Sequence, residues 1–138
     1  MREALTVVIL AYNESIHIER AIRNVIGWAH EVVVLDSGST DDTVTKAKSL
    51  GAKVYFRPFD NYAAQRSYAI KELPISIDWV LFLDADEYLS EKLKQEIVDV
   101  IGNTDCQGFD IKRRYIFQGK WIRHGGYYPT WILRLFKA

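Results

Sequence analysis

The sequence contains a single cysteine, Cys106, so no disulfide can form within the chain. Long apolar runs are also missing, since the run that begins at Leu5 ends at Tyr12, far short of the ~20 residues of a membrane-spanning helix. Asn13-Glu14 follows that run, where a secretory signal would place small residues for cleavage. These absences exclude a disulfide-stabilised secreted scaffold, and we expect a reducing, cytoplasmic setting.

Two nucleotide-binding motifs are absent as well. No G-x-G-x-x-G follows the first apolar run, which disfavours dinucleotide binding of the Rossmann kind, and no G-x-x-x-x-G-K-[ST] is present, which excludes a P-loop. The three histidines are scattered without the spacing of zinc ligands. Any nucleotide or metal chemistry must therefore rest on other side chains.

The composition is that of an ordinary globular protein, with 138 residues, 49% hydrophobic and 26% charged. The net charge is zero, but residues 1–106 carry 11 basic and 17 acidic residues, whereas residues 107–138 carry 7 basic and 1 acidic. The second segment also holds 8 of the 18 aromatic residues. It is either a second binding surface or a hairpin whose aromatic side chains pack inward, and composition leaves both readings open.

Apolar runs alternate with helical patterns through the first 106 residues. Strands are predicted at 5–11, 31–35, 53–56 and 79–83, and the first, second and fourth lack the polar alternation of a solvent-facing strand. Helices are predicted from residue 18 to Gly27, from a cap at Ser39 or Thr40 to Gly51, over 61–72, and after a cap at Ser90. This alternation predicts a parallel α/β sheet.

Beyond residue 107 the pattern becomes that of strands, predicted at 109–115, 120–123 and 131–136. The sequence stops directly after the last of them, at Ala138. We therefore expect it to be a fragment of a longer protein.

Polar residues follow three of the predicted strands, namely Tyr12-Asn13-Glu14, Asp36-Ser37 and Asp84-Ala85-Asp86-Glu87. Ligands of open parallel sheets bind beyond the carboxyl ends of the strands. Carboxylates gathered there repel one another unless a cation compensates, and hard oxygen ligands suit Mg²⁺ or Mn²⁺. An isolated D-x-D is more often a solvated loop or a helix start, but this one directly follows the buried run WVLFL. A metal there could hold a diphosphate.

Three segments, VVILAYNES, VVVLDSGSTDDT and WVLFLDADE, in this order resemble the donor-binding half of family 2 glycosyltransferases. The tail RRYIFQGKWIRHGGYYPTWILRLFK is similar to lipopolysaccharide core β-1,4-glucosyltransferases of Gram-negative bacteria. The resemblance implies a GT-A (Rossmann-like) fold, with a mostly parallel sheet flanked by helices and a β-rich C-terminal segment. Residues 1–106 would form the nucleotide-sugar-binding α/β domain, and residues 107–138 would begin the acceptor side of the same fold.

The resemblance also implies roles for individual residues. Ala11, Tyr12 and Glu14 would line the uridine and ribose pocket, and Asp36 would accept a hydrogen bond from the uracil N–H with Ser37 beside it. The simpler alternatives are that Tyr12 is a buried strand-end aromatic and that Asp36 merely precedes a turn.

Arg66 matches a basic position near the base and the phosphates, and its alternative is an exposed helix residue. Asp84 and Ala85 would contact the nucleotide sugar. Asp86, with Asp84, would ligate Mn²⁺ or Mg²⁺. Glu87 either supports these ligands or is merely solvated.

Inverting enzymes of this fold use a carboxylate downstream of the D-x-D as general base. The acids after Glu87 lie on the last helix, facing solvent, or at positions 105 and 110, before the acceptor-side tail. We therefore expect the base to lie beyond Ala138, and the 138-residue chain to bind a donor but to transfer its sugar poorly.

The function predicted from the sequence is inverting transfer of a sugar, with glucose the leading choice, from a UDP-sugar to a lipopolysaccharide core or related glycan. The basic tail would attract anionic lipid, which predicts a cytoplasmic protein peripheral to the inner membrane face. The alternatives are a polyprenyl-phosphate acceptor, a nucleotide-sugar-binding module without catalysis and a receiver-like signalling domain. No nucleic-acid partner is expected, and the linkage and oligomeric state stay open.

Overall fold

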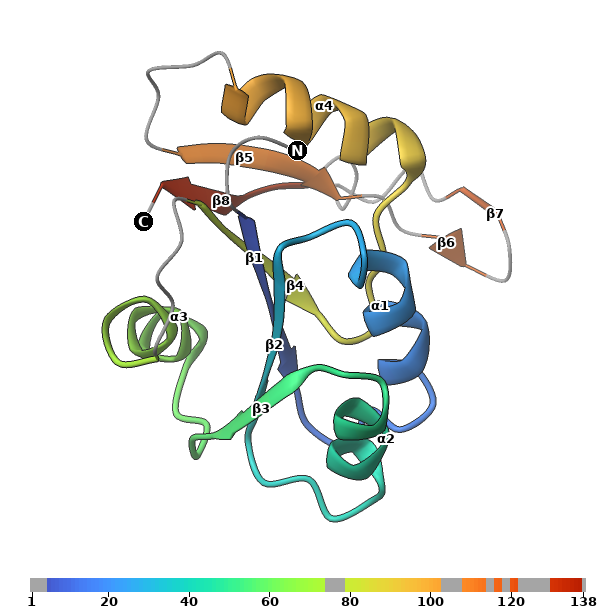
Figure 1. The fold of residues 1–138 in the computed structure, drawn as a ribbon, viewed down its shortest axis with the longest axis vertical. Helices are drawn as coiled ribbons and strands as arrows, with labels where there is room; N and C mark the ends of the chain where they lie inside the picture. The colour runs from blue at the N-terminus through green and yellow to red at the C-terminus, as the bar shows by residue number, and fades with distance from the viewer. Residues whose placement is uncertain are drawn as a thin grey trace.

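The computed structural model describes residues 5–73, 79–102, 108–113, 116–117, 120–121 and 130–137. Its main feature is a six-stranded sheet in the order β3-β2-β1-β4-β8-β5, with helices on both faces (Figure 1). The strands are β1 (Leu5–Ala11), β2 (Glu31–Asp36), β3 (Lys53–Phe56), β4 (Trp79–Asp84), β5 (Gly108–Arg113) and β8 (Thr130–Lys137). Two short strands, β6 (Ile116–Phe117) and β7 (Lys120–Trp121), form a separate antiparallel pair.

The first four strands are parallel, as predicted. β1 lies between β2 and β4, so that Val8 is in register with Val33 on one side and Phe82 on the other. β8 runs antiparallel to β4, and β5 runs antiparallel to β8. The C-terminal strands therefore extend the same sheet, and the predicted fold class is confirmed. The functional division at residue 106 stays a prediction.

Of the helices in the described residues, three cover one face of the sheet and one covers the other (Figure 1). α1 (Ile18–Val25), α2 (Thr43–Ser49) and α4 (Glu91–Gly102) share the first face, whereas α3 (Tyr62–Lys71) lies on the second. The Ser90 hydroxyl accepts a hydrogen bond from the Leu93 N–H at 3.1 Å, so the predicted cap of α4 is confirmed. Within the described ranges, no helix is long and apolar enough to cross a membrane.

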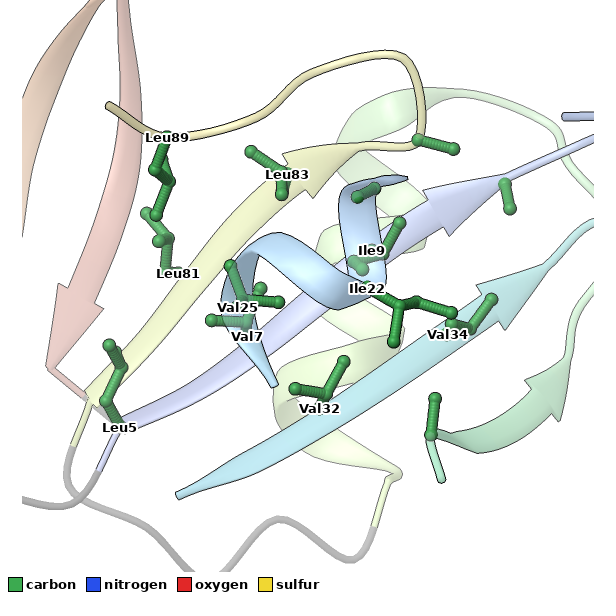
Figure 2. Packing of buried hydrophobic residues seen from close by; sticks show 14 of the residues in the cluster. Leu5, Val7, Ile9, Ile22, Val25, Val32, Val34, Leu81, Leu83 and Leu89 are labelled. Carbon is green, nitrogen blue, oxygen red and sulfur yellow. The ribbon is translucent and has the colours of Figure 1, made fainter. Parts of the chain in front are cut away.

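Burial on both faces explains the uninterrupted apolar runs. On the first face, Val7, Ile9, Val34 and Leu83 belong to one buried cluster with Ile22 of α1 (Figure 2). The alternate strand residues turn to α3 and form a second core of Val8, Val33, Leu35, Val80 and Phe82 with Ala69 and Leu73. Each fully buried side chain of this size stabilises the fold by about 1.5–3 kcal/mol. A polar residue at such a position would therefore be costly.

The predicted cap of α2 is wrong. Ser39 and Thr40 do not cap this helix, because it begins at Thr43 and Asp42 occupies the N-cap position without a side-chain hydrogen bond. Instead, the Ser39 hydroxyl accepts from the Asn13 N–H at 2.8 Å, and the Thr40 N–H donates to Asn13 Oδ1 at 2.8 Å. Residues that could have capped a helix locally are thus used to join two loops.

Candidate functional site

A cavity of about 690 Å³ lies beyond the carboxyl ends of the four parallel strands. These ends are level, since Ala11 is in register with Asp36, Leu10 with Asp84, and Asp36 with Phe56. The loops that follow the strands therefore meet around one space. It is lined by Leu10, Ala11, Tyr12, Glu14, Ser37, Pro58, Phe59, Gln65, Asp84, Ala85 and Asp86.

Most of the residues predicted from the sequence come together here. The cavity lining includes Ala11, Tyr12, Glu14, Ser37, Asp84, Ala85 and Asp86. Asp36 is not among the lining residues, and Arg66 lies on α3 with a side chain outside the described part of the chain. The structure thus shows that these residues are neighbours, while their roles in binding stay predictions.

Asp84 and Asp86 form the acidic end of the cavity. Asp84 ends β4 and is half-buried, whereas Asp86, two residues on, is exposed. The Asp84 N–H donates to Glu87 Oε1 at 2.8 Å, so Glu87 fixes the turn on which both aspartates lie. The reading of Glu87 as merely solvated is therefore wrong.

The acidic end offers two carboxylates, and no group of three or more His, Cys, Asp or Glu among the described residues could hold a metal. A closed structural zinc site would need four protein ligands. Mg²⁺, in contrast, is commonly held by one or two carboxylates together with water and substrate phosphates. The donor set therefore fits a hard divalent ion shared with a diphosphate.

Asp36 is held by its own loop. It is 3% exposed, and its Oδ2 accepts from the N–H groups of Gly38 at 2.9 Å and Ser39 at 2.8 Å. Its Oδ1 accepts from the Ser39 hydroxyl at 2.5 Å, which leaves that oxygen further acceptor capacity. The carboxylate thus shapes the loop that presents Ser37, and its predicted contact with a uracil N–H stays a prediction.

Tyr12 and Glu14 follow β1. Tyr12 is 56% exposed, so the alternative that it is a buried strand-end aromatic is wrong. Glu14 is half-buried, and its Oε2 lies 2.9 Å from His17 Nδ1. Its N–H donates to Thr43 Oγ1 at 3.0 Å, which ties this loop to the start of α2.

Four lining residues were not predicted from the sequence: Leu10, Pro58, Phe59 and Gln65. Leu10 lies in β1, one residue before its end. Pro58 and Phe59 follow β3, so their position beyond the carboxyl end of a strand is the signal that indicates them. Gln65 carries no such signal, because an isolated glutamine in a helix is usually exposed. It is nevertheless only 1% exposed, and it lines the cavity.

An ion pair supports this side of the cavity. Arg57 Nη1 lies 2.9 Å from Asp60 Oδ1, and the guanidinium lies over the Tyr68 ring, 5.5 Å from its centroid. The hydrogen bond from Arg57 lowers the pKa of Asp60 to about 2, and the same bond raises the pKa of Arg57. Both groups are therefore charged at neutral pH.

The family described as glycosyl transferase family 2 matches residues 6–137, so the chain belongs to this family. This membership contradicts the receiver-like alternative. An uncharacterized glycosyltransferase of Rickettsia bellii is 50% identical over 101 residues, covering 70% of this chain and 34% of that protein. A second one, from Rickettsia conorii, is 46% identical over 97 residues with the same coverage. The chain thus spans about a third of the length of these relatives.

A more distant relative is the lipopolysaccharide core biosynthesis glycosyltransferase LpsC of Rhizobium meliloti, 28% identical over 116 residues, with 80% of this chain and 42% of that protein covered. Among solved structures, glucosyl-3-phosphoglycerate synthase of Mycobacterium tuberculosis, in complex with Mn²⁺, UDP-glucose and glycerol 3-phosphate, is 30% identical with a TM-score of 0.54. The match covers 73% of this chain and 39% of that one. The predicted GT-A fold is in agreement with this likeness.

Proposed function

We propose that this chain is the donor-binding part of a metal-dependent, inverting glycosyltransferase whose donor is a UDP-sugar. The observation that carries the proposal is the composition of one cavity, which is lined by Asp84 and Asp86 at and after the end of β4 and by Ser37 and Phe59 after β2 and β3. The family membership and the UDP complexes of the mycobacterial synthase support the same donor class.

The order of the strands gives the cavity a direction. The lining loops follow β4, β1, β2 and β3, which are consecutive neighbours in the sheet. At about 4.8 Å between strands, three intervals span about 14 Å. A base, a ribose and a diphosphate laid in line suit such a span. The diphosphate then lies at the acidic β4 end, and the base lies at the β2–β3 end.

Each predicted residue has a place in this arrangement. Asp86, with Asp84, would hold Mn²⁺ or Mg²⁺, and Ala85 would adjoin the sugar. Such an ion would offset the charge that develops on the departing diphosphate. Tyr12, beside Ala11 and Glu14, would contact the ribose. Asp36 and Ser37 would contact the base, with Arg66 near the base and phosphates.

In the transfer step, an acceptor hydroxyl oxygen forms a bond to the anomeric carbon as the bond from that carbon to the diphosphate oxygen breaks. The nucleoside diphosphate leaves with the electron pair, and the hydroxyl proton passes to a general base. Glu91, Glu96 and Asp99 are exposed on α4 and do not line the cavity. The proposal therefore does not take the general base from α4.

We further propose glucose as the sugar and a lipopolysaccharide core or related anionic glycan as the acceptor. UDP-glucose complexes of the mycobacterial synthase support the sugar, and the name of LpsC supports the acceptor. Residues 107–138 contain 7 basic residues and 1 acidic residue. This positive charge suits a phosphorylated acceptor and peripheral attachment to an anionic membrane surface.

Calorimetric titration of UDP into the chain, with and without Mn²⁺, tests the donor site. We expect binding that depends on the metal and is lost in Asp86→Ala, because that substitution removes a metal ligand. Asp99→Ala, on the exposed side of α4, is the matched control and should bind normally. A folded chain that binds no UDP in the presence of Mn²⁺ would contradict the proposal.

A further inference from the structure

The side-chain amide of Gln65 has a fixed direction. Arg57 Nη1 donates to Gln65 Oε1 at 2.8 Å, and the Arg57 carbonyl oxygen lies 3.4 Å from Gln65 Nε2. A guanidinium has only donors and a carbonyl has only acceptors. Both contacts therefore require the amide oxygen to face the guanidinium and the amide nitrogen to face away from it.

This direction determines the hydrogen bonding of Ser37. Gln65 Nε2 donates to Ser37 Oγ at 3.1 Å, so the serine hydroxyl is an acceptor toward Gln65. Its single O–H must then be donated elsewhere. No acceptor for this O–H is found within the part of the chain that the structure describes, and Ser37 lines the cavity. The hydroxyl thus offers a donor to whatever occupies the cavity.

The series of hydrogen bonds from Arg57 through Gln65 to Ser37 is held in place by further contacts of Arg57. The Arg57 guanidinium is held by Asp60 through contacts of 2.9 and 3.3 Å, and the Arg57 N–H donates to the Asp36 carbonyl oxygen at 3.0 Å. Gln65 is 1% exposed, so reversing its amide would leave buried polar atoms facing groups of the same kind. The donor character of Ser37 is therefore built into the fold.

We infer that Gln65 is a specificity-determining residue, which makes Ser37 select a base with a keto oxygen and reject one with an amino group at the same place. The inference rests on the proposed function, since it requires the base to lie at the β2–β3 end of the cavity. Uracil and cytosine bear a keto oxygen and an amino group, respectively, at the same carbon. A donating Ser37 hydroxyl hydrogen-bonds the first and meets a second donor in the other.

Gln65→Glu tests this inference by reversing one hydrogen bond. The new carboxylate can still accept from Arg57, but it cannot donate to Ser37, so the Ser37 hydroxyl turns to donate to it. Ser37 then presents lone pairs to the cavity. We expect the ratio of UDP to CDP affinity, measured by calorimetry with Mn²⁺, to fall about tenfold. The added negative charge weakens both nucleotides alike and cancels in the ratio.

Ser37→Ala provides a second route to the same result, because it removes the donor without adding charge. The UDP-to-CDP ratio should fall, and adding Gln65→Glu to Ser37→Ala should change it no further, since the two residues act through one hydroxyl. Gln95→Glu, an identical change at an exposed position of α4, is the control and should leave the ratio as in the wild type.

The outcomes separate this inference from the proposed function. If the wild type binds UDP with Mn²⁺ but Gln65→Glu leaves the ratio unchanged, the inference is wrong and the donor site stands. A wild type that binds UDP and CDP equally also overturns the inference. If the wild type binds neither nucleotide, the proposed function fails and the inference fails with it.

Discussion

Asn24 of α1 and Leu89, 65 residues later, exchange two hydrogen bonds. Asn24 Nδ2 donates to the Leu89 carbonyl oxygen at 2.9 Å, and the Leu89 N–H donates to Asn24 Oδ1 at 2.7 Å. Close by, Arg20 Nη2 donates to the Asp86 carbonyl oxygen at 3.1 Å, and Lys94 Nζ donates to the Asn24 carbonyl oxygen. The loop that carries Asp86 is therefore held to α1 through its main chain, which leaves the Asp86 carboxylate available to a metal.

Asn24→Ala should remove both hydrogen bonds to Leu89. The partly buried N–H and carbonyl groups of Leu89 would then lack these partners. We expect the free energy of unfolding, measured with urea, to fall by about 1–3 kcal/mol. Metal-dependent UDP binding should weaken too, because the Asp86 loop loses an anchor. Arg23→Ala is the control: Arg23 is exposed and bonded to Glu19, so its loss should cost less than about 0.5 kcal/mol. Equal destabilisation by the two substitutions would show that the Asn24–Leu89 hydrogen bonds do not contribute specifically to stability.

Arg20→Ala should separate metal binding from stability. Arg20 is exposed and lies over the Tyr88 ring, 4.6 Å from its centroid, in addition to its bond to Asp86. Exposed contacts of this kind contribute about 0.5–1 kcal/mol, so unfolding should change little. We expect several-fold weaker Mn²⁺-dependent UDP binding, because the turn that orients Asp86 is less restrained. Unchanged Mn²⁺ dependence in the calorimetric titration would show that Arg20 does not position this turn.

The parallel strands and the position of the polar residues that follow them could be predicted from the sequence, because both depend on local patterns. The runs VVIL, VVVL and WVLFL are buried on both sides, and the polar residues that follow them lie at one level of the sheet. The burial of Gln65 could not be predicted, because its hydrogen-bond partners, Arg57 and Ser37, lie in the loops that follow β3 and β2 and not in α3. The capping role predicted for Ser39 and Thr40 is wrong for the same reason, because their partner, Asn13, is 26 and 27 residues away.

The Arg57–Asp60 pair predicts a specific acid response. The pKa of Asp60 is lowered from 3.8 to about 2 by its hydrogen bond from Arg57. A carboxylate with a depressed pKa contributes stability above its unfolded pKa, and this contribution is lost as the pH falls through the folded value. The free energy of unfolding should therefore decline between about pH 4 and pH 2. In Asp60→Asn, it should depend less steeply on pH over the same range.

Urea unfolding at a series of pH values measures this effect, with Asp99→Asn on the exposed side of α4 as the matched control. The difference between wild type and Asp60→Asn should be small, because the pair is exposed to solvent. If the free energy of unfolding falls equally steeply with pH below pH 4 in the wild type and in Asp60→Asn, the Arg57–Asp60 pair does not contribute to stability.

Gly38 follows Ser37 in the loop that Asp36 organises. Its φ is +105°, a backbone conformation that residues other than glycine rarely adopt. A Cβ there would also lie 3.4 Å from the Phe56 ring. Gly38→Ala should therefore destabilise the fold by about 1–2 kcal/mol through backbone strain and should displace the Ser37 hydroxyl. Gly27→Ala is a matched control, since Gly27 has a φ of +82° but a Cβ there would have nothing within 4 Å. Both variants should lose comparable stability to urea, but only Gly38→Ala should weaken UDP binding, because only this glycine borders the cavity loop. Parallel losses of UDP affinity in the two variants would show that affinity follows global stability and does not depend on the geometry of residues 36–39.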